Sequence, residues 1–282
     1  MFLTPGKDRR PAARAAGVLR AYAADGVELV VRHDPGPTAD LAFVLAHGFT
    51  GNSGQPKVRR IARLLSRSGG VLSVDFRGHG DSQGWCTLGH TEVLDVAAVV
   101  RLARDLGYRR VVSIGFSMGA SVVIRQAYLD RDGPAAVDGV VAISGPAFWY
   151  YRGTPVMRVV HHLVEHAAGR AALRSRGVRL WGGGWPTPPP MPPYEAAAGL
   201  APIPFLVVHG DVDRYFPLDH PRALHRAAQQ AGHRAAELWI IPGMGHAEAA
   251  IEPATVSAIA QWVQATVTSP DLSSTSPTPG MR

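Results

Sequence analysis

The sequence predicts an α/β protein built on a mostly parallel β-sheet with helices on both faces. Short runs rich in Val, Ile and Leu alternate with segments of helical periodicity along most of the chain. This alternation is typical of strand–helix units whose strands pair in parallel. The chain has 282 residues and is 46% hydrophobic, so it is long enough to bury the core of one large domain.

The expected elements follow one another in a regular order. Residues 18–23 and 27–32 flank Asp25-Gly26, a pair that favours a tight turn, and they predict an N-terminal hairpin. Each later strand is predicted by a short apolar run, and each helix by an apolar stripe. Thr91 is a suitable N-cap for the helix that begins there. We expect strands at 41–46, 71–75, 110–114, 137–144, 205–209 and 236–241, and helices at 55–66, 91–106, 117–129, 219–231 and 250–266.

Two kinds of segment interrupt this order. Residues 147–199 contain no clear strand, are rich in aromatic side chains and end in a stiff Gly/Pro run. We expect them to form a small cap inserted over the edge of the sheet, between core segments 16–146 and 200–268. Residues 1–15 and 269–282 are expected to be flexible termini, and the second has the composition of a disordered tail.

Composition and charge exclude several classes of function. The net charge is +7, but the basic residues are scattered and form no patch with interleaved aromatic residues, so we expect no nucleic-acid partner. No apolar run approaches the ~18 to 20 residues of a membrane helix, and no secretory signal is recognisable at the N-terminus. A single cysteine, Cys86, rules out an intramolecular disulfide and a multi-cysteine zinc site. We therefore expect a soluble, cytoplasmic protein.

The strongest motif is Gly115-Phe116-Ser117-Met118-Gly119, which joins a predicted strand to a predicted helix. In a G-x-S-x-G turn the serine projects its Oγ out of the sheet, and the glycines relieve the crowding of the strained backbone. The positive end of the following helix lies under the serine. A plain turn with a capping serine would also fit the five residues alone, but the strand–turn–helix context favours a nucleophile.

A second motif, His47-Gly48-Phe49-Thr50-Gly51-Asn52, comes directly after the predicted strand at 41–46. A turn of small residues at this point can direct the backbone N–H of Phe49 at a developing oxyanion. The N–H of Met118 would be the second donor.

Two further loops supply an acid and a base at the ends of predicted strands. Asp211 and Asp213 follow the strand at 205–209, and His246 follows the strand at 236–241. These loops lie at the same sheet edge that presents Ser117. A serine needs a base to become nucleophilic, and the base needs an acid that fixes its tautomer. The order Ser…Asp…His is therefore that of a catalytic triad.

These motifs resemble those of the α/β-hydrolase superfamily, and the resemblance covers roughly residues 18–268. HGFTGN, DFRGHGDS, GFSMG, HGDVD and GMGH look like the motifs of bacterial serine carboxylesterases and monoacylglycerol lipases. The resemblance implies an α/β-hydrolase fold with eight strands and a two-step cleavage of a carboxylic ester that needs no metal or cofactor. It implies Ser117 as nucleophile, His246 as base and Asp213 as acid, with Asp211 as the rival acid.

The aromatic residues of the expected cap suggest a pocket for an apolar small-molecule ester. The pocket residues that we expect are His47, Trp149, Tyr150 and Trp185. The same triad would also serve a thioesterase, an amidase or peptidase, or an acyltransferase. A protein of this fold that binds a ligand without turning it over is a further alternative.

Other chemically suggestive residues have simpler explanations. His162, Glu165 and His166 fit the H-x-x-E-H zinc pattern, but a polar helix stripe explains them and no third ligand is obvious. We therefore expect no metal. Cys86 is expected to be structural or merely next to the pocket. His79 and His47 are expected to lie near the pocket, behind the residues that line it, and not to act as bases.

Overall fold

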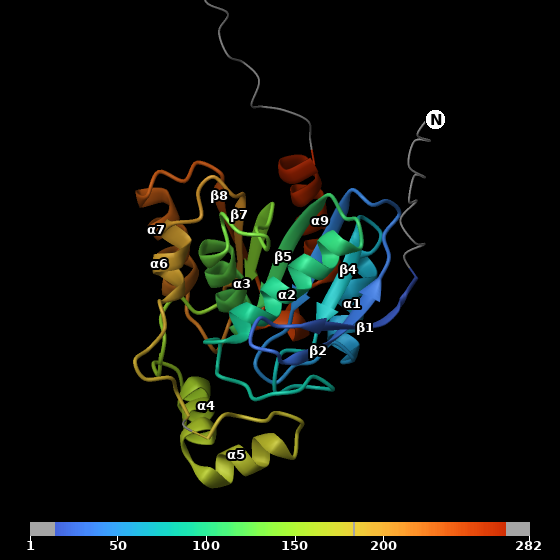
Figure 1. Ribbon diagram of the computed structural model, residues 1–282. Coiled ribbons are helices and arrows are strands. Elements are labelled where there is room, and N and C mark those ends of the chain that lie inside the picture. The colour runs from blue at the N-terminus through green and yellow to red at the C-terminus, as the bar shows by residue number, and fades with distance from the viewer. Residues whose placement is uncertain (1–14, 183, 269–282) are drawn as a thin grey trace, which may run out of the picture.

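The computed structural model describes residues 15–182 and 184–268 and contains a single eight-stranded sheet (Figure 1). The strands are β1 (Gly17–Tyr22), β2 (Glu28–Asp34), β3 (Leu41–Ala46), β4 (Gly70–Val74), β5 (Arg110–Phe116), β6 (Gly139–Ile143), β7 (Phe205–Gly210) and β8 (Ala236–Ile241). Their order in the sheet is β1-β2-β4-β3-β5-β6-β7-β8. The pairs β1–β2 and β2–β4 are antiparallel, and the other neighbours are parallel. The predicted fold, an α/β-hydrolase with a mostly parallel sheet, is confirmed.

Segments 1–14 and 269–282, which make up nearly all of the termini expected to be flexible, lie outside the described residues. Among the described residues, no helix is both long enough and apolar enough to cross a membrane.

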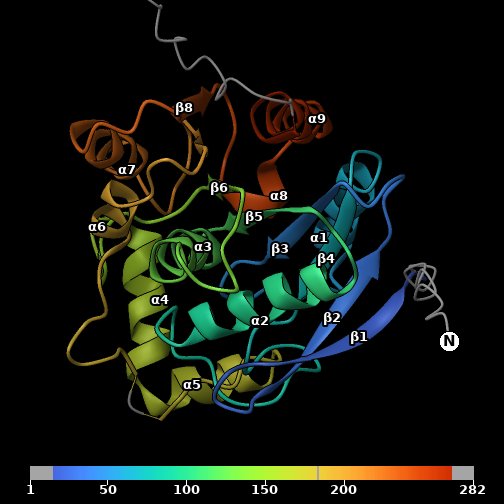
Figure 2. The same cartoon turned by 45° about the horizontal axis from the view of Figure 1, so that its top comes forward.

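Helices cover both faces of the sheet (Figure 2). The helices of the core are α1 (Pro56–Leu65), α2 (Glu92–Asp105), α3 (Met118–Leu129), α7 (Asp219–Gln230), α8 (Ala247–Ala250) and α9 (Pro253–Val263), followed by a π-helical turn, η1 (Gln264–Thr268). α1 and α9 bury their apolar stripes against one face of the sheet, and α2, α3 and α7 bury theirs against the other.

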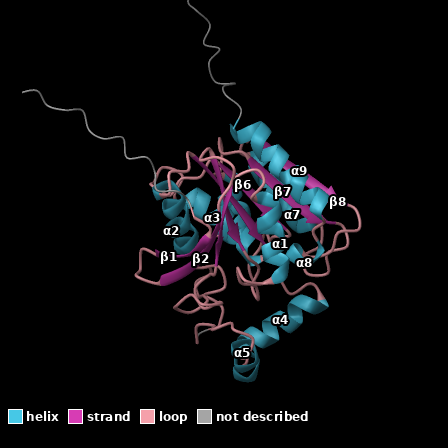
Figure 3. Ribbon diagram, turned by 90° about the vertical axis from the view of Figure 1, so that its right-hand side faces the viewer, coloured by secondary structure: helices cyan, strands magenta, loops and turns pink. Residues whose placement is uncertain are grey.

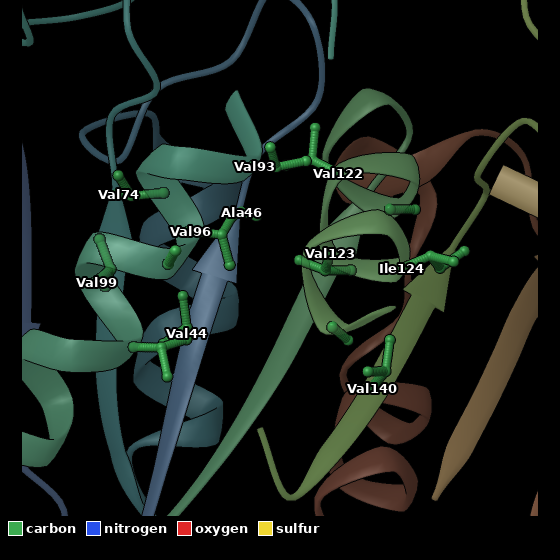
Figure 4. Packing of buried hydrophobic residues seen from close by; sticks show 14 of the residues in the cluster. Val44, Ala46, Val74, Val93, Val96, Val99, Val122, Val123, Ile124 and Val140 are labelled. Atoms are coloured by element: carbon green, nitrogen blue, oxygen red, sulfur yellow. The ribbon is translucent and has the colours of Figure 1, made fainter. Parts of the chain in front are cut away.

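The central strands are buried on both sides, which explains their continuous apolar sequences. In β3, Val44 and Ala46 point to the α2–α3 face, whereas Phe43 and Leu45 point to the α1–α9 face. Figure 4 shows the first of these layers, in which valines of α2 and α3 pack over the sheet. The rigid sheet therefore fixes where each strand ends, and the loops of interest begin at those ends.

Most expected elements differ from the observed ones by one to three residues at an end, and two helices differ in more than that. The helix expected at 250–266 begins at Pro253, because proline fits the first helical position, and residues 247–250 form the separate short helix α8. Thr91 occupies the N-cap position of α2, but its side chain does not cap the helix. Its hydroxyl instead contacts Arg77 and Thr87.

The segment 147–199, expected to be a cap, contains no strand among its described residues but three helices. These are α4 (Pro155–Glu165), α5 (Ala167–Arg174) and α6 (Pro193–Ala198). Figure 3 shows α4 and α5 beyond one end of the strands, whereas α6 packs beside α7. Isolated bridges from Val178 to His79 and from Leu180 to Cys86 join the segment to the loop after β4.

Candidate active site

Ser117 lies on a strained turn between β5 and α3. Its backbone has φ 52° and ψ −114°, a region that few residues other than glycine adopt. The turn is tight on both sides: a Cβ on Gly115 would collide with the carbonyl oxygen of Gly119, and one on Gly119 with that of Ala46. The two glycines of the motif are therefore required by close backbone approach.

A chain of hydrogen bonds runs from Ser117 through His246 to Asp213. The Ser117 Oγ lies 2.9 Å from His246 Nε2, and His246 Nδ1 lies 2.8 Å from Asp213 Oδ2. The other carboxylate oxygen accepts hydrogen bonds from the backbone N–H groups of Tyr215 (2.7 Å) and Phe216 (3.2 Å). The Tyr215 ring stacks on the imidazole at 4.0 Å. These contacts fix both the carboxylate and the ring that it faces.

The electrostatics of this chain keep the Asp213 side chain ionised. Burial alone would raise the pKa of the carboxyl group, but the hydrogen bond and charge of His246 and the N–H of Tyr215 outweigh it, so the pKa lies below its usual value. An ionised Asp213 accepts the Nδ1–H of the imidazole. The Nε2 lone pair of His246 is then left facing the Ser117 hydroxyl.

The rival aspartate is placed elsewhere. Asp211 is exposed, and its Oδ1 accepts a hydrogen bond from the Gly243 N–H at 2.7 Å. It therefore closes the loop that leads to His246 and makes no contact with the imidazole.

The turn after β3 brings Phe49 into the same cavity wall as Ser117. Within the described residues, neither the backbone N–H of Phe49 nor that of Met118 has a hydrogen-bond acceptor in the protein, and both residues line one cavity with Ser117. The Gly48 carbonyl oxygen accepts from His47 Nδ1 (2.7 Å) and from the Gly51 N–H (2.8 Å). Because a peptide is planar, fixing this carbonyl also fixes the opposite direction of the Phe49 N–H.

His47 lies behind the cavity wall and does not line it, contrary to the expectation that it belongs to the pocket. Both of its ring nitrogens are used, one for the Gly48 carbonyl and the other for the Phe76 N–H. Burial holds the pKa of His47 well below its ordinary value. His79 is buried beside it and contacts the Phe49 carbonyl at 2.5 Å. Both histidines therefore support the turn.

The cavity that contains Ser117 has a volume of about 620 Å³. Much of its wall comes from the 147–199 segment, including the expected residues Trp149, Tyr150 and Trp185. Their polar atoms are turned to the protein: Trp149 Nε1 donates to the Met191 carbonyl at 3.1 Å, and the Tyr150 hydroxyl to the Pro186 carbonyl. These side chains therefore present mainly apolar surface to the cavity.

The residues of the H-x-x-E-H pattern do not converge. The His162 and His166 rings stack on each other at 4.1 Å, while Glu165 accepts hydrogen bonds from Trp185, Arg152 and His161. No group of three or more His, Cys, Asp or Glu side chains that could hold a metal ion is found among the described residues. Cys86 is buried, and burial raises the pKa of its thiol.

Three residues without a recognisable motif also belong to the site. Tyr215 stacks on His246, His161 lines the cavity from α4, and the buried carboxylate of Glu248 lines it from α8. The nearness of Tyr215 to Asp213 and of Glu248 to His246 in the sequence is the only signal that could have indicated two of them.

Comparisons with known proteins agree with this architecture. Residues 37–180 match the family model described as serine aminopeptidase, S33. No curated protein matches the chain. The structure resembles the esterase Pf2001 of Pyrococcus furiosus (20% identity, TM-score 0.70, 90% of this chain and 93% of that one). It also resembles Est1E of Butyrivibrio proteoclasticus with bound ferulic acid (19% identity, TM-score 0.65, 88% of this chain and 99% of that one). A third similar structure is an alpha-beta serine hydrolase homologue of Coxiella burnetii (18% identity, TM-score 0.59, 90% of this chain and 99% of that one). At these identities the likeness concerns the fold.

Proposed function

The chain belongs to the serine aminopeptidase S33 family of serine hydrolases, and we propose that it cleaves a carboxylic ester through an acyl-enzyme intermediate. The observation that carries the proposal is the chain of hydrogen bonds from Asp213 through His246 to Ser117. Ser117 and His246 line a largely apolar cavity. A buried carboxylate, an imidazole and a strained serine hydroxyl in this arrangement are suited to nucleophilic attack on a carbonyl carbon.

In the first step, the Ser117 Oγ attacks the ester carbonyl while His246 Nε2 takes the hydroxyl proton. Asp213 holds the imidazole in the required tautomer and stabilises its positive charge. The carbonyl oxygen becomes an oxyanion, for which the N–H groups of Phe49 and Met118 are the donors. When the tetrahedral intermediate collapses, His246 gives its proton to the departing alcohol, and the acyl group remains on Ser117.

In the second step, water takes the place of the alcohol. His246 accepts a proton from this water as its oxygen attacks the acyl carbon, and the same two N–H groups face the new oxyanion. Collapse of the intermediate returns the proton to Ser117 Oγ and releases the carboxylic acid. The cycle uses only residues of this chain and water.

The cavity favours an ester whose acyl or alcohol group is apolar. The aromatic wall offers burial worth ~25 cal/mol per Å² of apolar substrate surface. One of the structures compared above is named an esterase, and this name supports an ester in preference to the thioester and amide substrates that the same triad could attack.

A fluorophosphonate probe and a substrate panel test the proposal. We expect the probe to modify Ser117 in the folded protein, located by peptide mass spectrometry, and we expect Ser117→Ala to remain unmodified. In a panel of matched p-nitrophenyl esters, thioesters and amino-acid anilides, esters should give the highest kcat/KM. A folded protein that takes up no probe would indicate a binding protein, and a preference for anilides would indicate a peptidase.

A further inference from the structure

Glu248 is a buried carboxylate in the cavity wall that the proposed mechanism does not use. Its side chain is 4% exposed, and it lies two residues after His246, in α8. Its Oε1 accepts a hydrogen bond of 2.7 Å from the backbone N–H of Gly48, the residue that precedes Phe49. This contact joins the loop that carries the base to the turn that carries the candidate oxyanion donor.

The backbone around Glu248 is held in place from several directions. Ala247 has φ 53°, and its N–H donates to the Ser144 Oγ at 3.1 Å. Arg60 donates to the carbonyl oxygens of Glu248 (3.3 Å) and Ile251 (2.8 Å). The left-handed backbone conformation of Ala247 is unfavourable and persists because these contacts stabilise it. The contacts therefore fix the direction that the chain takes after His246.

Gly48 lies in close contact with both Glu248 and Ser117. A Cβ at position 48 would lie 3.3 Å from the Ser117 Cβ and 3.4 Å from Glu248 Oε2. The N–H of Gly48 is held by Glu248, and its carbonyl oxygen by His47 and Gly51. With both ends of the residue held, the peptide that follows has one orientation, and so does the Phe49 N–H.

The Glu248 side chain supplies an oxygen acceptor within reach of this N–H, and the amide oxygen of a side chain of the same length would supply one too. The charge is partly balanced by Lys57, whose Nζ lies 4.0 Å from Oε2 and whose side chain is 36% exposed. Such a distant, solvated lysine contributes little attraction. The contact with Gly48 is therefore the main interaction that the carboxylate makes.

We propose that Glu248 is a positioning residue that holds the Gly48–Phe49 turn in register with His246, so that the Phe49 N–H faces the oxyanion formed at Ser117. This inference rests on the proposed esterase function. It assigns Glu248 a role through the length and acceptor of its side chain, not through its charge.

Two substitutions at position 248 separate length from charge. Glu248→Gln keeps the chain length and an acceptor oxygen for the Gly48 N–H but removes the charge. Glu248→Asp keeps the charge but shortens the side chain by one methylene, so the carboxylate no longer reaches Gly48. Glu252→Gln and Glu252→Asp are matched controls, because Glu252 is exposed and lies six residues after His246.

We expect Glu248→Asp to lower kcat for a short p-nitrophenyl ester by about 10- to 100-fold with KM changed by less than about 2-fold, since a misaligned oxyanion donor affects the transition state alone. The rate of phosphonylation of Ser117 should fall in parallel. Glu248→Gln and both Glu252 variants should stay within about 3-fold of the unmodified protein on the same measure. Rates are expressed per folded molecule, with thermal unfolding recorded for every variant.

Several outcomes would overturn the inference. Wild-type kcat in Glu248→Asp would show that the contact does not matter, and an equal loss in Glu248→Gln would assign the role to the charge. A rise in KM at constant kcat would make Glu248 a substrate-binding group. If the unmodified protein hydrolyses esters and is labelled at Ser117 while any of these results holds, this inference alone fails. If the unmodified protein does neither, the proposed function fails and the inference with it.

Discussion

At the scale of single residues, the proposed reaction depends on three side chains that act together. Ser117 is held on a strained turn, and His246 reaches it at 2.9 Å with its other nitrogen 2.8 Å from Asp213. The hydroxyl gains nothing from its position without the base, and the base has no fixed tautomer without the acid. The effects of substitutions at these positions are therefore expected not to add.

Ser117→Ala and His246→Ala should each abolish ester hydrolysis almost completely, and the double variant should be no worse than either one. The physical reason is that each substitution already removes the whole nucleophilic pathway. Steady-state kinetics of the three variants, with folding checked by circular dichroism, test this expectation. Losses that multiply in the double variant would show that the two residues act separately.

Asp213→Asn should lower kcat on the order of 10⁴-fold, because an amide cannot hold the imidazole in the required tautomer. Asp211→Asn is the matched control, since Asp211 is exposed and contacts Gly243. We expect it to change kcat by less than about 3-fold. If Asp211→Asn proves the more damaging substitution, the acid is misassigned.

The residues of the hydrogen-bond chain could be predicted because their signals are local. Ser117 lies in a pentapeptide whose glycines are required by backbone contact, and Asp213 and His246 follow strands that end at the same sheet edge. For His47 the sequence allowed two places, in the pocket wall or just behind it, because the choice depends on a turn that folds back on its own carbonyl. Glu248 was hidden, because its partner is 200 positions away in the chain.

At the scale of elements, the strands were predicted closely and the helices of the 147–199 segment were not. β3 and β8 have the bounds expected for them, since a short apolar run between polar turns leaves little freedom. α4 and α5 pack on each other beyond the sheet. Their apolar side chains are therefore placed by contacts within the 147–199 segment. The alternation of strands and helices in the rest of the sequence gives no information about those contacts.

The 147–199 segment contributes most of the aromatic wall of the cavity, and we predict that it determines substrate choice. Trp149→Ala or Trp185→Ala should lower kcat/KM for an octanoate ester relative to an acetate ester by about 10-fold. Each ring removes apolar substrate surface from water, and losing one is worth about a kcal/mol or more. Competition between the two p-nitrophenyl esters measures the ratio directly.

The control for this comparison is Trp181→Ala, because Trp181 is 59% exposed and does not line the cavity. Its octanoate-to-acetate ratio should match that of the unmodified protein. An unchanged ratio in folded Trp149→Ala and Trp185→Ala would mean that these rings pack the cap and do not contact the substrate.

At the scale of the whole molecule, the 147–199 segment is joined to α7 through the buried His220. His220, at the start of α7, accepts a hydrogen bond from the Ala147 N–H at 3.0 Å, where the 147–199 segment begins. Its ring also packs against Tyr151 at 4.5 Å. The pKa of His220 is lowered from 6.5 to about 4, chiefly by burial of the ring and secondly by the charge of the nearby His209. The folded protein therefore holds this ring neutral.

This depressed pKa predicts acid sensitivity in a defined range. Between pH 6.5 and about 4, the unfolded chain binds a proton at His220 that the folded chain does not. The free energy of unfolding is therefore fully retained above pH 6.5 and falls as the pH drops through this window, by on the order of 3 kcal/mol from this residue. Burial lowers the pKa of His47, His209 and His233 as well, so several protons contribute in the same direction.

His220→Gln isolates the share of one residue, because a glutamine oxygen can accept the Ala147 N–H but does not titrate. The variant should be less stable at neutral pH, since it loses the ring contacts with Tyr151 and Phe216. Its free energy of unfolding should nevertheless fall less steeply as the pH is lowered. The difference in slope should correspond to up to about one proton bound on unfolding. Urea unfolding of both proteins at several pH values between about 7 and 4 gives the two slopes. Parallel slopes would mean that folded His220 takes up its proton over the same pH range as the unfolded chain does, and the Ala147 N–H would then need another acceptor in acid.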